Sequence, residues 1–151
     1  MKKAAAIIVS VIILFTAGII GYNAVMNSGK ITNCKETIGE SEAFSKKEIK
    51  EAMNTIKIKF LLGYEDCELV SLTYDEEFCK SEIERYLKTG KGAVNGASKE
   101  NVIVISSDFL VGEEPSGDSG LTPGTSYKGW KWTLIRNSKN GKWVVDSWGF
   151  C

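Results

Sequence analysis

The sequence contains no histidine in its 151 residues. Catalysis by Ser-His-Asp or Cys-His groups within one chain is therefore excluded, because both depend on an imidazole as the base. The commonest zinc enzyme sites are excluded for the same reason, since they use histidine ligands. An enzyme built from this chain would have to work with carboxylates, lysine, tyrosine or cysteine.

An excess of positive charge is also missing, because 19 lysines and arginines balance 19 aspartates and glutamates. Lys2 and Lys3 lie at the extreme N-terminus, so the rest of the chain has a small excess of acidic residues. Proteins that bind nucleic acid need clustered positive charge to neutralise phosphates. We therefore expect no nucleic-acid partner and no polybasic patch for a membrane surface.

Close metal-ligand spacings and phosphate loops are absent too: the sequence has no Cys-x-x-Cys pair, and Gly90-Lys91-Gly92 lacks the P-loop pattern. The loop at 112–126 carries Glu113, Glu114 and Asp118, whose carboxylates suit calcium. Their spacing does not match an EF-hand, and a solvated loop is the favoured interpretation. We expect no cofactor and no bound metal.

The four cysteines are Cys34, Cys67, Cys79 and Cys151. An even number permits disulfides in an oxidising compartment, and four cysteines allow three complete pairings. Cys67 with Cys79 is the most local pair, whereas Cys34 with Cys151 would join the two ends of the domain. Free thiols are the alternative, and the sequence does not choose among these states.

The N-terminus begins with Met-Lys-Lys at residues 1–3 and continues as an apolar run at residues 4–22. As a helix rising about 1.5 Å per residue, this run is long enough to cross the ~30 Å hydrocarbon core of a bilayer. A cleaved signal peptide is the alternative, but no Ala-x-Ala-like site follows the run. We therefore predict a single-pass transmembrane anchor in the cell membrane, with Lys2 and Lys3 in the cytoplasm and everything after Tyr22 outside. Secretion after signal cleavage is the alternative location.

Residues 23–41 are polar with scattered glycines and predict a juxtamembrane linker. Residues 42–151 are numerous enough for one extracytoplasmic domain with a single core. No internal repeat or low-complexity tract divides this stretch.

A strong helix start lies at Ser45, whose side chain can cap the first turn while Glu48 reaches back to complete a capping box. Phe44 before the cap and Ile49 inside the helix can form a hydrophobic staple. Gly63 is a natural stop. Apolar residues recur at helical spacing and form one stripe that we expect to pack on a sheet, namely Ile49, Ala52, Met53, Ile56 and Phe60.

The middle of the chain predicts a short strand at 67–74, a second helix capped by Asp75, a glycine-rich loop at 89–98, and a strand at 101–111. The last of these contains four consecutive apolar residues, Val102 to Ile105. Such a run indicates a central strand that is covered on both faces.

The C-terminal stretch 127–151 holds all four tryptophans and predicts a β-hairpin. In its first strand Trp130, Trp132 and Leu134 are expected on one face, with Tyr127, Lys131, Thr133 and Ile135 on the other. Asn140-Gly141 is the turn signal, but it leaves the register open. A two-residue turn would place Trp143 and Val145 on the Trp132 face; a type I turn with Gly141 in a bulge would pair Trp132 with Trp148 and Trp130 with Phe150. The second is favoured because it stacks large aromatics.

Large aromatic residues dominate core energetics, so packing is the favoured role of these tryptophans. The alternative is a platform for a ligand. The residues that we single out as candidate ligand contacts are Tyr127, Trp130, Trp132 and Trp148.

The order helix, strand, helix, strand and hairpin resembles a cone-shaped α+β fold in which a curved antiparallel sheet wraps a long helix. The nuclear transport factor 2-like superfamily has this shape, as do cystatin-like domains. From about Phe44 to the end, the chain also resembles a domain-of-unknown-function family of exported proteins from Gram-positive bacteria. The matching residues are Cys67-Glu68-Leu69, Tyr74-Asp75-Glu76-Glu77, Asp108-Phe109, Tyr127-Lys128-Gly129-Trp130-Lys131-Trp132, Leu134-Ile135-Arg136, Trp143-Val144-Val145 and Trp148-Gly149-Phe150.

Together with the anchor predicted from the apolar run, the expected architecture is an N-terminal transmembrane helix followed by the cone-shaped domain, with a curved antiparallel sheet packed on a long helix. The resemblance implies no catalytic residue, because the family has no established activity. The favoured function is a membrane-anchored binding or assembly module for a protein, a cell-wall component or a second copy of itself. One alternative is an enzyme of the ketosteroid-isomerase type, in which a buried carboxylate acts as the general base. Asp108, Asp146 and Tyr74 are the candidate acid–base groups. Another is an immunity-like accessory protein that occupies a membrane partner.

Overall fold

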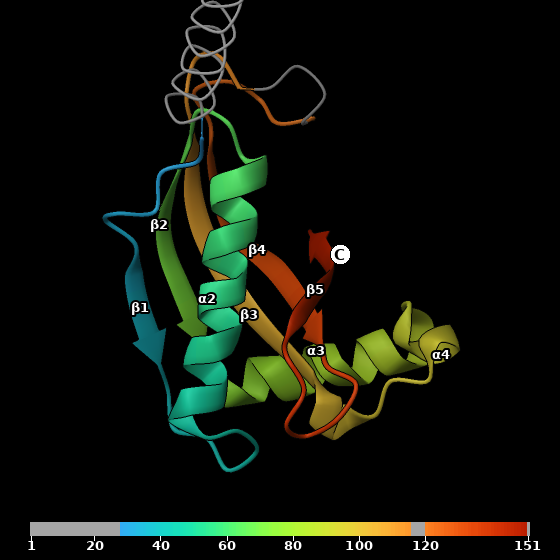
Figure 1. Ribbon diagram of the computed structural model, residues 1–151. Coiled ribbons are helices and arrows are strands. Elements are labelled where there is room, and N and C mark those ends of the chain that lie inside the picture. Colours follow the sequence, from blue (N-terminus) through green and yellow to red (C-terminus); the bar gives the residue numbers. More distant parts are fainter. Residues whose placement is uncertain (1–27, 116–119, 151) are drawn as a thin grey trace, which may run out of the picture.

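The computed structural model describes residues 28–115 and 120–150. Figure 1 shows a single sheet with the long helix α2 (Lys46–Gly63) lying along it and α3 (Glu76–Thr89) crossing near one end. The predicted anchor at residues 4–22 lies outside the described residues. Within 28–115 and 120–150, no helix combines the length and the apolar character needed to span a membrane.

The sheet has five strands that lie side by side in sequence order. The first two strands run parallel, and each later pair is antiparallel. The α+β class is found, but the prediction of an antiparallel sheet is wrong, because β1 and β2 run parallel and the sheet is mixed. The strands are β1 (Lys35–Ile38), β2 (Cys67–Tyr74), β3 (Val102–Val111), β4 (Ser126–Ile135) and β5 (Val144–Gly149).

The parallel pair arises because β1 precedes α2. The helix carries the chain back along the sheet, so β2 starts at the same end as β1 and runs in the same direction. Strand β1 lies within the stretch that was expected to be a linker, and Lys30 forms a further bridge to Glu68. Its four residues, KETI, alternate between exposed and half-buried positions, so this short edge strand has no strong apolar pattern.

Helix α2 begins as the sequence predicts. The Ser45 side chain accepts a hydrogen bond from the Glu48 backbone N–H, and the Glu48 carboxylate accepts one from the Ser45 backbone N–H at 2.9 Å. Phe44 and Ile49 are both buried. The predicted stripe is confirmed, because the buried residues of α2 are Ile49, Ala52, Met53, Ile56 and Phe60.

The two long helices cover opposite faces of the sheet. Trp132 of β4 contacts the ring of Tyr64, which follows α2, with ring centroids 5.5 Å apart. Its neighbour Lys131 instead pairs with Glu82 of α3 at 2.9 Å. Successive side chains of a strand point to opposite faces, so α2 and α3 lie on different sides. The four apolar residues that begin β3 are therefore buried, as predicted for a central strand.

The second helix is capped by Asp75, whose Oδ1 accepts a hydrogen bond from the Phe78 backbone N–H at 2.8 Å. The stretch predicted as a loop after it contains the single-turn helix α4 (Gly92–Asn95), and the 3₁₀ helix η1 (Lys99–Asn101) leads into β3. Gly92 lies against the Tyr86 ring, where an added Cβ would come within 2.6 Å of a ring carbon. A glycine is therefore required for the chain to turn this closely around α3.

The hairpin register is the favoured one, with Trp132 paired to Trp148. The β-bulge that produces this register was expected at Gly141 but lies within β5. Thr133 pairs with Ser147 and Leu134 with Val145, so the extra residue is Asp146 in β5, and Gly141 in the turn is not the source. A bulge shifts the pairing by one residue, so either position would bring the two tryptophans opposite each other.

The cysteines at 34, 67 and 79 are free thiols, and Cys151 lies outside the described residues. Cys67 starts β2, while Cys79 lies in α3 beyond the other end of that strand. A strand of this length spans more than 20 Å at about 3.3 Å per residue, whereas a disulfide needs Cα atoms within about 7 Å. The most local pairing is thus incompatible with the fold.

Candidate functional site

The four aromatic residues predicted as ligand contacts have different environments. Trp132 is fully buried, and its indole N–H donates to Ser107 Oγ at 2.8 Å. Tyr127 and Trp130 are half-buried against the core. Trp148 is 46% exposed and is the one member of the set that presents much of its ring to solvent. The structure therefore assigns Trp132 to packing and leaves Trp148 as the accessible contact residue.

Tyr127 shares a face with the tryptophans, although strict alternation along β4 placed it on the other side. The pairing of Ser107 with Trp130 and of Phe109 with Tyr127 leaves Lys128 and Gly129 opposite Asp108 alone. This bulge is closed by a 2.9 Å hydrogen bond from the Gly129 N–H to Asp108 Oδ1, and Gly129 takes a φ of 68°, which favours glycine. The extra residue turns Tyr127 toward Trp130.

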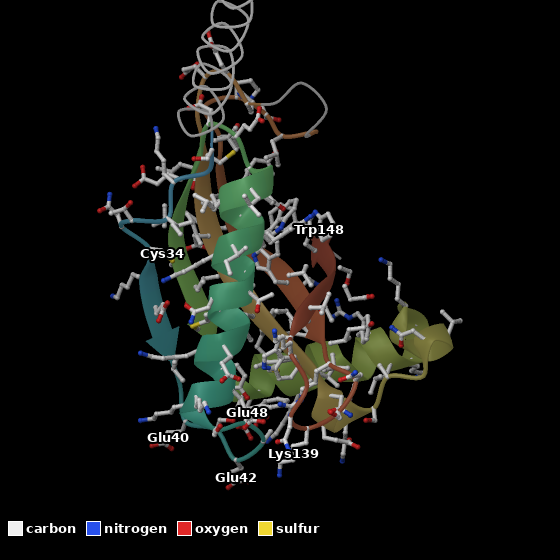
Figure 2. The ribbon with its side chains drawn as sticks, viewed as in Figure 1. Cys34, Glu40, Glu42, Glu48, Lys139 and Trp148 are labelled. Carbon is white, nitrogen blue, oxygen red and sulfur yellow. The ribbon has the colours of Figure 1, made fainter. Side chains whose placement is uncertain are left out.

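Trp148 lies over the sheet face that α2 covers. Its ring stacks on Trp132 with centroids 6.5 Å apart, and the Lys59 ammonium of α2 lies 4.8 Å from its centroid. Figure 2 shows Trp148 beside the C-terminal half of α2. A cation over an indole face is attractive, so Lys59 holds the ring in one orientation while leaving part of it accessible.

Three further large apolar residues are exposed on α2 and at the end of the hairpin, and were missed in the sequence. Phe150 is 58% exposed, and on α2 Ile58 and Leu62 are 59% and 77% exposed. Leu62 follows Lys59 by three residues, so both lie on the same side of the helix. We call these four residues, Ile58, Leu62, Trp148 and Phe150, the apolar face. Apolar residues four apart and away from the buried stripe were the available sequence signal.

The apolar face has a rigid support. The Phe150 ring contacts Trp130 and Tyr127 with centroids at 5.1 and 5.8 Å, and Tyr127 in turn stacks on buried Phe109 at 5.1 Å. Aromatic pairs at these separations are attractive beyond their buried area. The exposed rings are thus continuous with the core and need little ordering when a partner binds.

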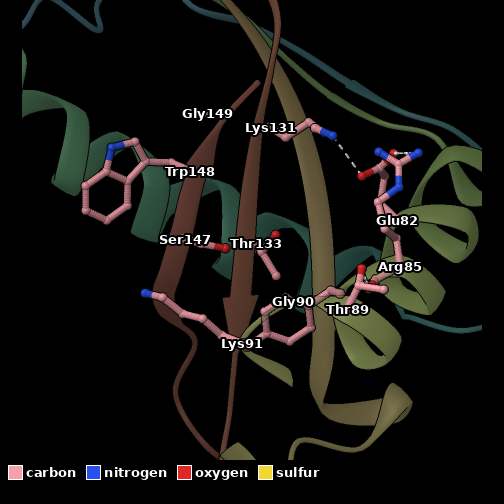
Figure 3. Close-up of a pocket in the computed structure, with 11 residues that line it drawn as sticks. Glu82, Arg85, Thr89, Gly90, Lys91, Lys131, Thr133, Ser147, Trp148 and Gly149 are labelled. Atoms are coloured by element: carbon pink, nitrogen blue, oxygen red, sulfur yellow. Dashed lines mark hydrogen bonds and ion pairs between the residues drawn. The ribbon is translucent and has the colours of Figure 1, made fainter. Parts of the chain in front are cut away.

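A separate cleft of about 310 Å³ lies on the opposite side of the sheet, between α3 and the strands β4 and β5 (Figure 3). Figure 3 shows the Trp148 ring pointing away from Lys131 and Lys91, although part of Trp148 belongs to the lining, so the cleft and the apolar face share this residue. The cleft is lined by charged side chains, hydroxyl groups and glycines, namely Glu82, Arg85, Tyr86, Thr89, Gly90, Lys91, Lys131, Thr133, Ser147 and Gly149, together with part of Trp148.

The floor of the cleft holds a shared ion pair. Glu82 lies 2.9 Å from the Lys131 ammonium and 3.3 Å from the Arg85 guanidinium, and the Glu82 and Lys131 side chains are each only 12% exposed. Lys91 donates to the Asp146 carbonyl at 2.9 Å from the other side. At the same end, the Tyr86 hydroxyl donates to Asp146 Oδ2 at 2.9 Å, and burial raises the pKa of Tyr86 to about 12.

The acid–base groups considered for an isomerase do not converge. Asp108 closes the β3–β4 bulge, Asp146 accepts from Tyr86, and the Tyr74 hydroxyl lies 3.0 Å from Ser41 Oγ. Burial raises the pKa of Tyr74 to about 12. Each group therefore has its own partner in a different part of the fold.

Metal-ligating side chains do not cluster among residues 28–115 and 120–150, where no group of three or more carboxylates or cysteines could hold an ion. The calcium hypothesis involved Asp118, which lies outside these ranges. Its two other members, Glu113 and Glu114, precede the gap, and the Glu114 backbone N–H donates to Asp66 Oδ2 at 2.9 Å.

Comparison of the chain with protein-family models, with curated proteins and with solved structures found no match. The resemblance to exported Gram-positive proteins and to the nuclear transport factor 2-like superfamily therefore stays a prediction from the sequence.

Proposed function

We propose that this domain is a binding module that holds a protein partner through the apolar face. The observation that carries the proposal is the exposure of four large apolar side chains, each at least 46% exposed, on the neighbouring elements α2 and β5 and at Phe150 directly after β5. Single exposed apolar residues are ordinary, but contiguous patches mark interaction surfaces. Burial of this surface by a partner would release the water that now covers it.

Trp148 is the expected centre of the contact. Tryptophan is among the residues that contribute most to protein interfaces, especially when its ring is held in place before binding. Here the Trp148 ring stacks on buried Trp132, and the ammonium of Lys59 on α2 lies over the same ring. A partner that adds apolar side chains around this ring would complete its burial.

The chemistry of the surface favours a protein with an apolar segment over a strongly charged ligand. The Lys59 ammonium already interacts with the Trp148 indole. An acidic group at the rim of the partner could replace solvent around Lys59 without opposing the apolar contacts. A second copy of this chain and a cell-wall polymer are the other occupants that an experiment should distinguish.

We also propose that the domain works outside the cytoplasmic membrane, where the sequence at residues 1–22 is expected to direct it. Protease added to intact cells should then degrade residues 28–150 while a cytoplasmic marker survives. Full protection of the domain in intact cells, with digestion after lysis, would contradict this location.

Site-directed photocrosslinking tests the binding proposal directly. The photoreactive amino acid p-benzoylphenylalanine is placed at Leu62 or Trp148 in the full-length protein, in cells of the native host. The control position is Lys88, an exposed residue of α3 on the opposite side of the sheet. Discrete adducts from positions 62 and 148, and none from 88, are expected.

The mass of the adduct identifies the occupant. A protein adduct different from twice the chain mass supports the proposal, whereas a doubled mass shows a homodimer and a polydisperse, glycosidase-sensitive adduct shows a wall polymer. A homodimer or a wall-polymer adduct would contradict the proposal that the partner is a different protein. Equal labelling from all three positions, or labelling from none, would refute the apolar face as a binding surface.

A further inference from the structure

We infer that the partner binds through an extended segment that pairs with the edge of β5 and continues the sheet. This inference rests on the proposed function, because it names the form of the protein segment that the apolar face holds. Strand β5 is the last strand of the sheet, with β4 on one side and no strand on the other among residues 28–115 and 120–150 (Figure 1). Such an edge presents a row of backbone donors and acceptors, which another extended chain can satisfy.

The outer side of β5 has no backbone partner in the described part of the chain. Apart from its ladder with β4, no backbone group of Val144–Gly149 bonds to another backbone group there. One group is occupied by a side chain, because the Lys91 ammonium donates to the Asp146 carbonyl at 2.9 Å. This contact lies at the bulge, so the regularly paired residues before and after Asp146 can still form a ladder with a partner strand.

Exposed apolar side chains lie on both faces of the sheet along this edge. Trp148 pairs with Trp132 on the face that α2 covers, and it is 46% exposed. Val144 is 59% exposed and pairs with Ile135, which shares the α3 face with Lys131. A partner that only covered the apolar face would leave Val144 in water. A strand beside β5 would contact residues on both faces, because side chains paired across strands lie about 4.5–5.5 Å apart.

The opposite edge of the sheet is protected where β5 is not. Strand β1 has four residues, of which Lys35 and Glu36 are charged, and Glu36 forms an ion pair with Lys57 of α2. Short length and charged side chains are common means by which proteins keep an edge strand from pairing. Strand β5 contains no lysine and no proline, and its protective features are Asp146 and the bulge at that residue. The less protected edge is therefore the one beside the apolar face.

The geometry of the edge also defines the chemistry of the bound segment. Side chains of an added strand that project to the α2 side would meet Trp148 and Phe150, so they should be apolar. Those that project to the α3 side would meet Val144 and the small side chain of Ser147. The segment should therefore carry an apolar residue at every second position, over about six residues, since this length at about 3.3 Å per residue matches β5.

Hydrogen exchange of the photoadduct tests this inference. The full-length protein with p-benzoylphenylalanine at Leu62 is crosslinked in cells of the native host, so that β5 keeps its natural sequence. Exchange in the purified adduct is compared by mass spectrometry with exchange in the same variant purified without irradiation. We expect the outward amides of β5 to exchange about tenfold or more slowly in the adduct, because they enter a new ladder. The amides of β1, at the other edge, should keep their rates.

The possible results separate this inference from the proposed function. An adduct in which protection is confined to α2, with unchanged exchange in β5, would overturn strand pairing and leave the binding proposal intact. Absence of any adduct from position 62 would refute both.

The substitution Val144→Lys provides a second, independent test. It places a charge on the edge strand but on the face opposite Trp148, so contact through the apolar face alone would tolerate it. Pairing along β5 should not, and the yield of the position-62 adduct should fall about tenfold. The matched control is Val94→Lys, which adds the same charge at an 87% exposed position of α4 and should leave the yield within about twofold. An unchanged yield in V144K, or equal losses in both variants, would overturn the inference.

Discussion

Arg136 and Glu48 are joined by a 2.8 Å ion pair that ties the end of the hairpin strand to the first turn of α2, across 88 positions of sequence. The Arg136 side chain is 4% exposed, and its guanidinium lies 4.3 Å from the Trp143 ring centroid. It also donates to the Glu100 carbonyl at 3.0 Å and to Asn101 Oδ1 at 3.3 Å. One side chain thus holds three separate segments together.

Replacing Arg136 with methionine should lower the free energy of unfolding by about 2–4 kcal/mol, because removal of one partner leaves polar groups of the others unpaired in a buried place. Arg136→Lys should give an intermediate loss, since lysine keeps the charge but not the planar fork. The control is Lys47→Met, which removes the exposed 3.9 Å pair with Glu51 and should cost less than about 0.5 kcal/mol. Urea unfolding followed by tryptophan fluorescence measures all three, and equal losses in R136M and K47M would contradict the prediction.

The same ion pair predicts a pH dependence. The hydroxyl hydrogen bond from Ser45, with help from Arg136, lowers the pKa of Glu48 from 4.5 to about 2. A carboxylate whose pKa is lower in the folded state stabilises the fold above its unfolded pKa and loses this contribution as the pH falls toward its folded value. The difference in unfolding free energy between the wild type and Glu48→Gln should therefore shrink between pH 5 and pH 2.

A constant difference between wild type and E48Q over that pH range would contradict this assignment. Ser45→Ala provides a second check, because it removes the largest cause of the lowered pKa and should flatten the same part of the stability curve. Denaturant midpoints at half-unit pH steps would resolve both effects.

Helix α2 and the hairpin could be predicted from the sequence because their signals are local. The spacing of Ser45 and Glu48 defines a cap, and the alternation of aromatic residues around Trp132 defines a strand. The register followed from placing Trp132 and Trp148 together, although the bulge that achieves it lies at Asp146. Preference for aromatic pairing was thus a better guide than turn chemistry.

The parallel strand β1 and the cleft could not be predicted, because their determinants are distant in sequence. Strand β1 has only four residues and no apolar alternation, and its partner β2 follows in the chain only after helix α2. The pair formed by Glu82 and Lys131 joins residues 49 positions apart on different elements. No local pattern marks either residue as part of a site.

Trp132 and Trp148 should respond differently to the same truncation, although they stack on each other. Trp132→Ala removes a fully buried ring and the donor to Ser107, so the free energy of unfolding should fall by about 3–5 kcal/mol. Trp148→Ala should cost about 1 kcal/mol, because nearly half of that ring is already exposed. Urea denaturation of the two variants checks this, and a larger loss for W148A would show that Trp148 belongs to the core.

Gly29, which lies against α2, and Gly63, the last residue of α2, give a matched pair of substitutions with opposite signs. An added Cβ at Gly29 would lie 2.5 Å from the Phe60 carbonyl oxygen, whereas one at Gly63 would meet nothing within 4 Å. Gly29→Ala should therefore destabilise the fold by about 1–3 kcal/mol through overpacking. Gly63→Ala should stabilise it by about 0.5 kcal/mol, because alanine restricts the unfolded chain and suits a helix. Thermal unfolding monitored by circular dichroism compares them, and a stabilised G29A variant would contradict the close approach.

The thiol of Cys79 should resist alkylation in the folded protein. It is buried, and burial raises its pKa to about 11, although its sulfur accepts a hydrogen bond from the Val104 backbone N–H at 3.3 Å. The thiolate is the reactive form, so at pH 8 this residue has roughly two-hundredfold less of it than a free cysteine with a pKa of about 8.5. Iodoacetamide treatment followed by peptide mass spectrometry should show no modification of Cys79 in native protein and full modification in urea. The native rate should rise about tenfold for each pH unit between 8 and 10, provided the fold persists. Alkylation at pH 8 as fast as in urea would show that the contact between α3 and β3 opens readily, and that the thiol is not held in the core.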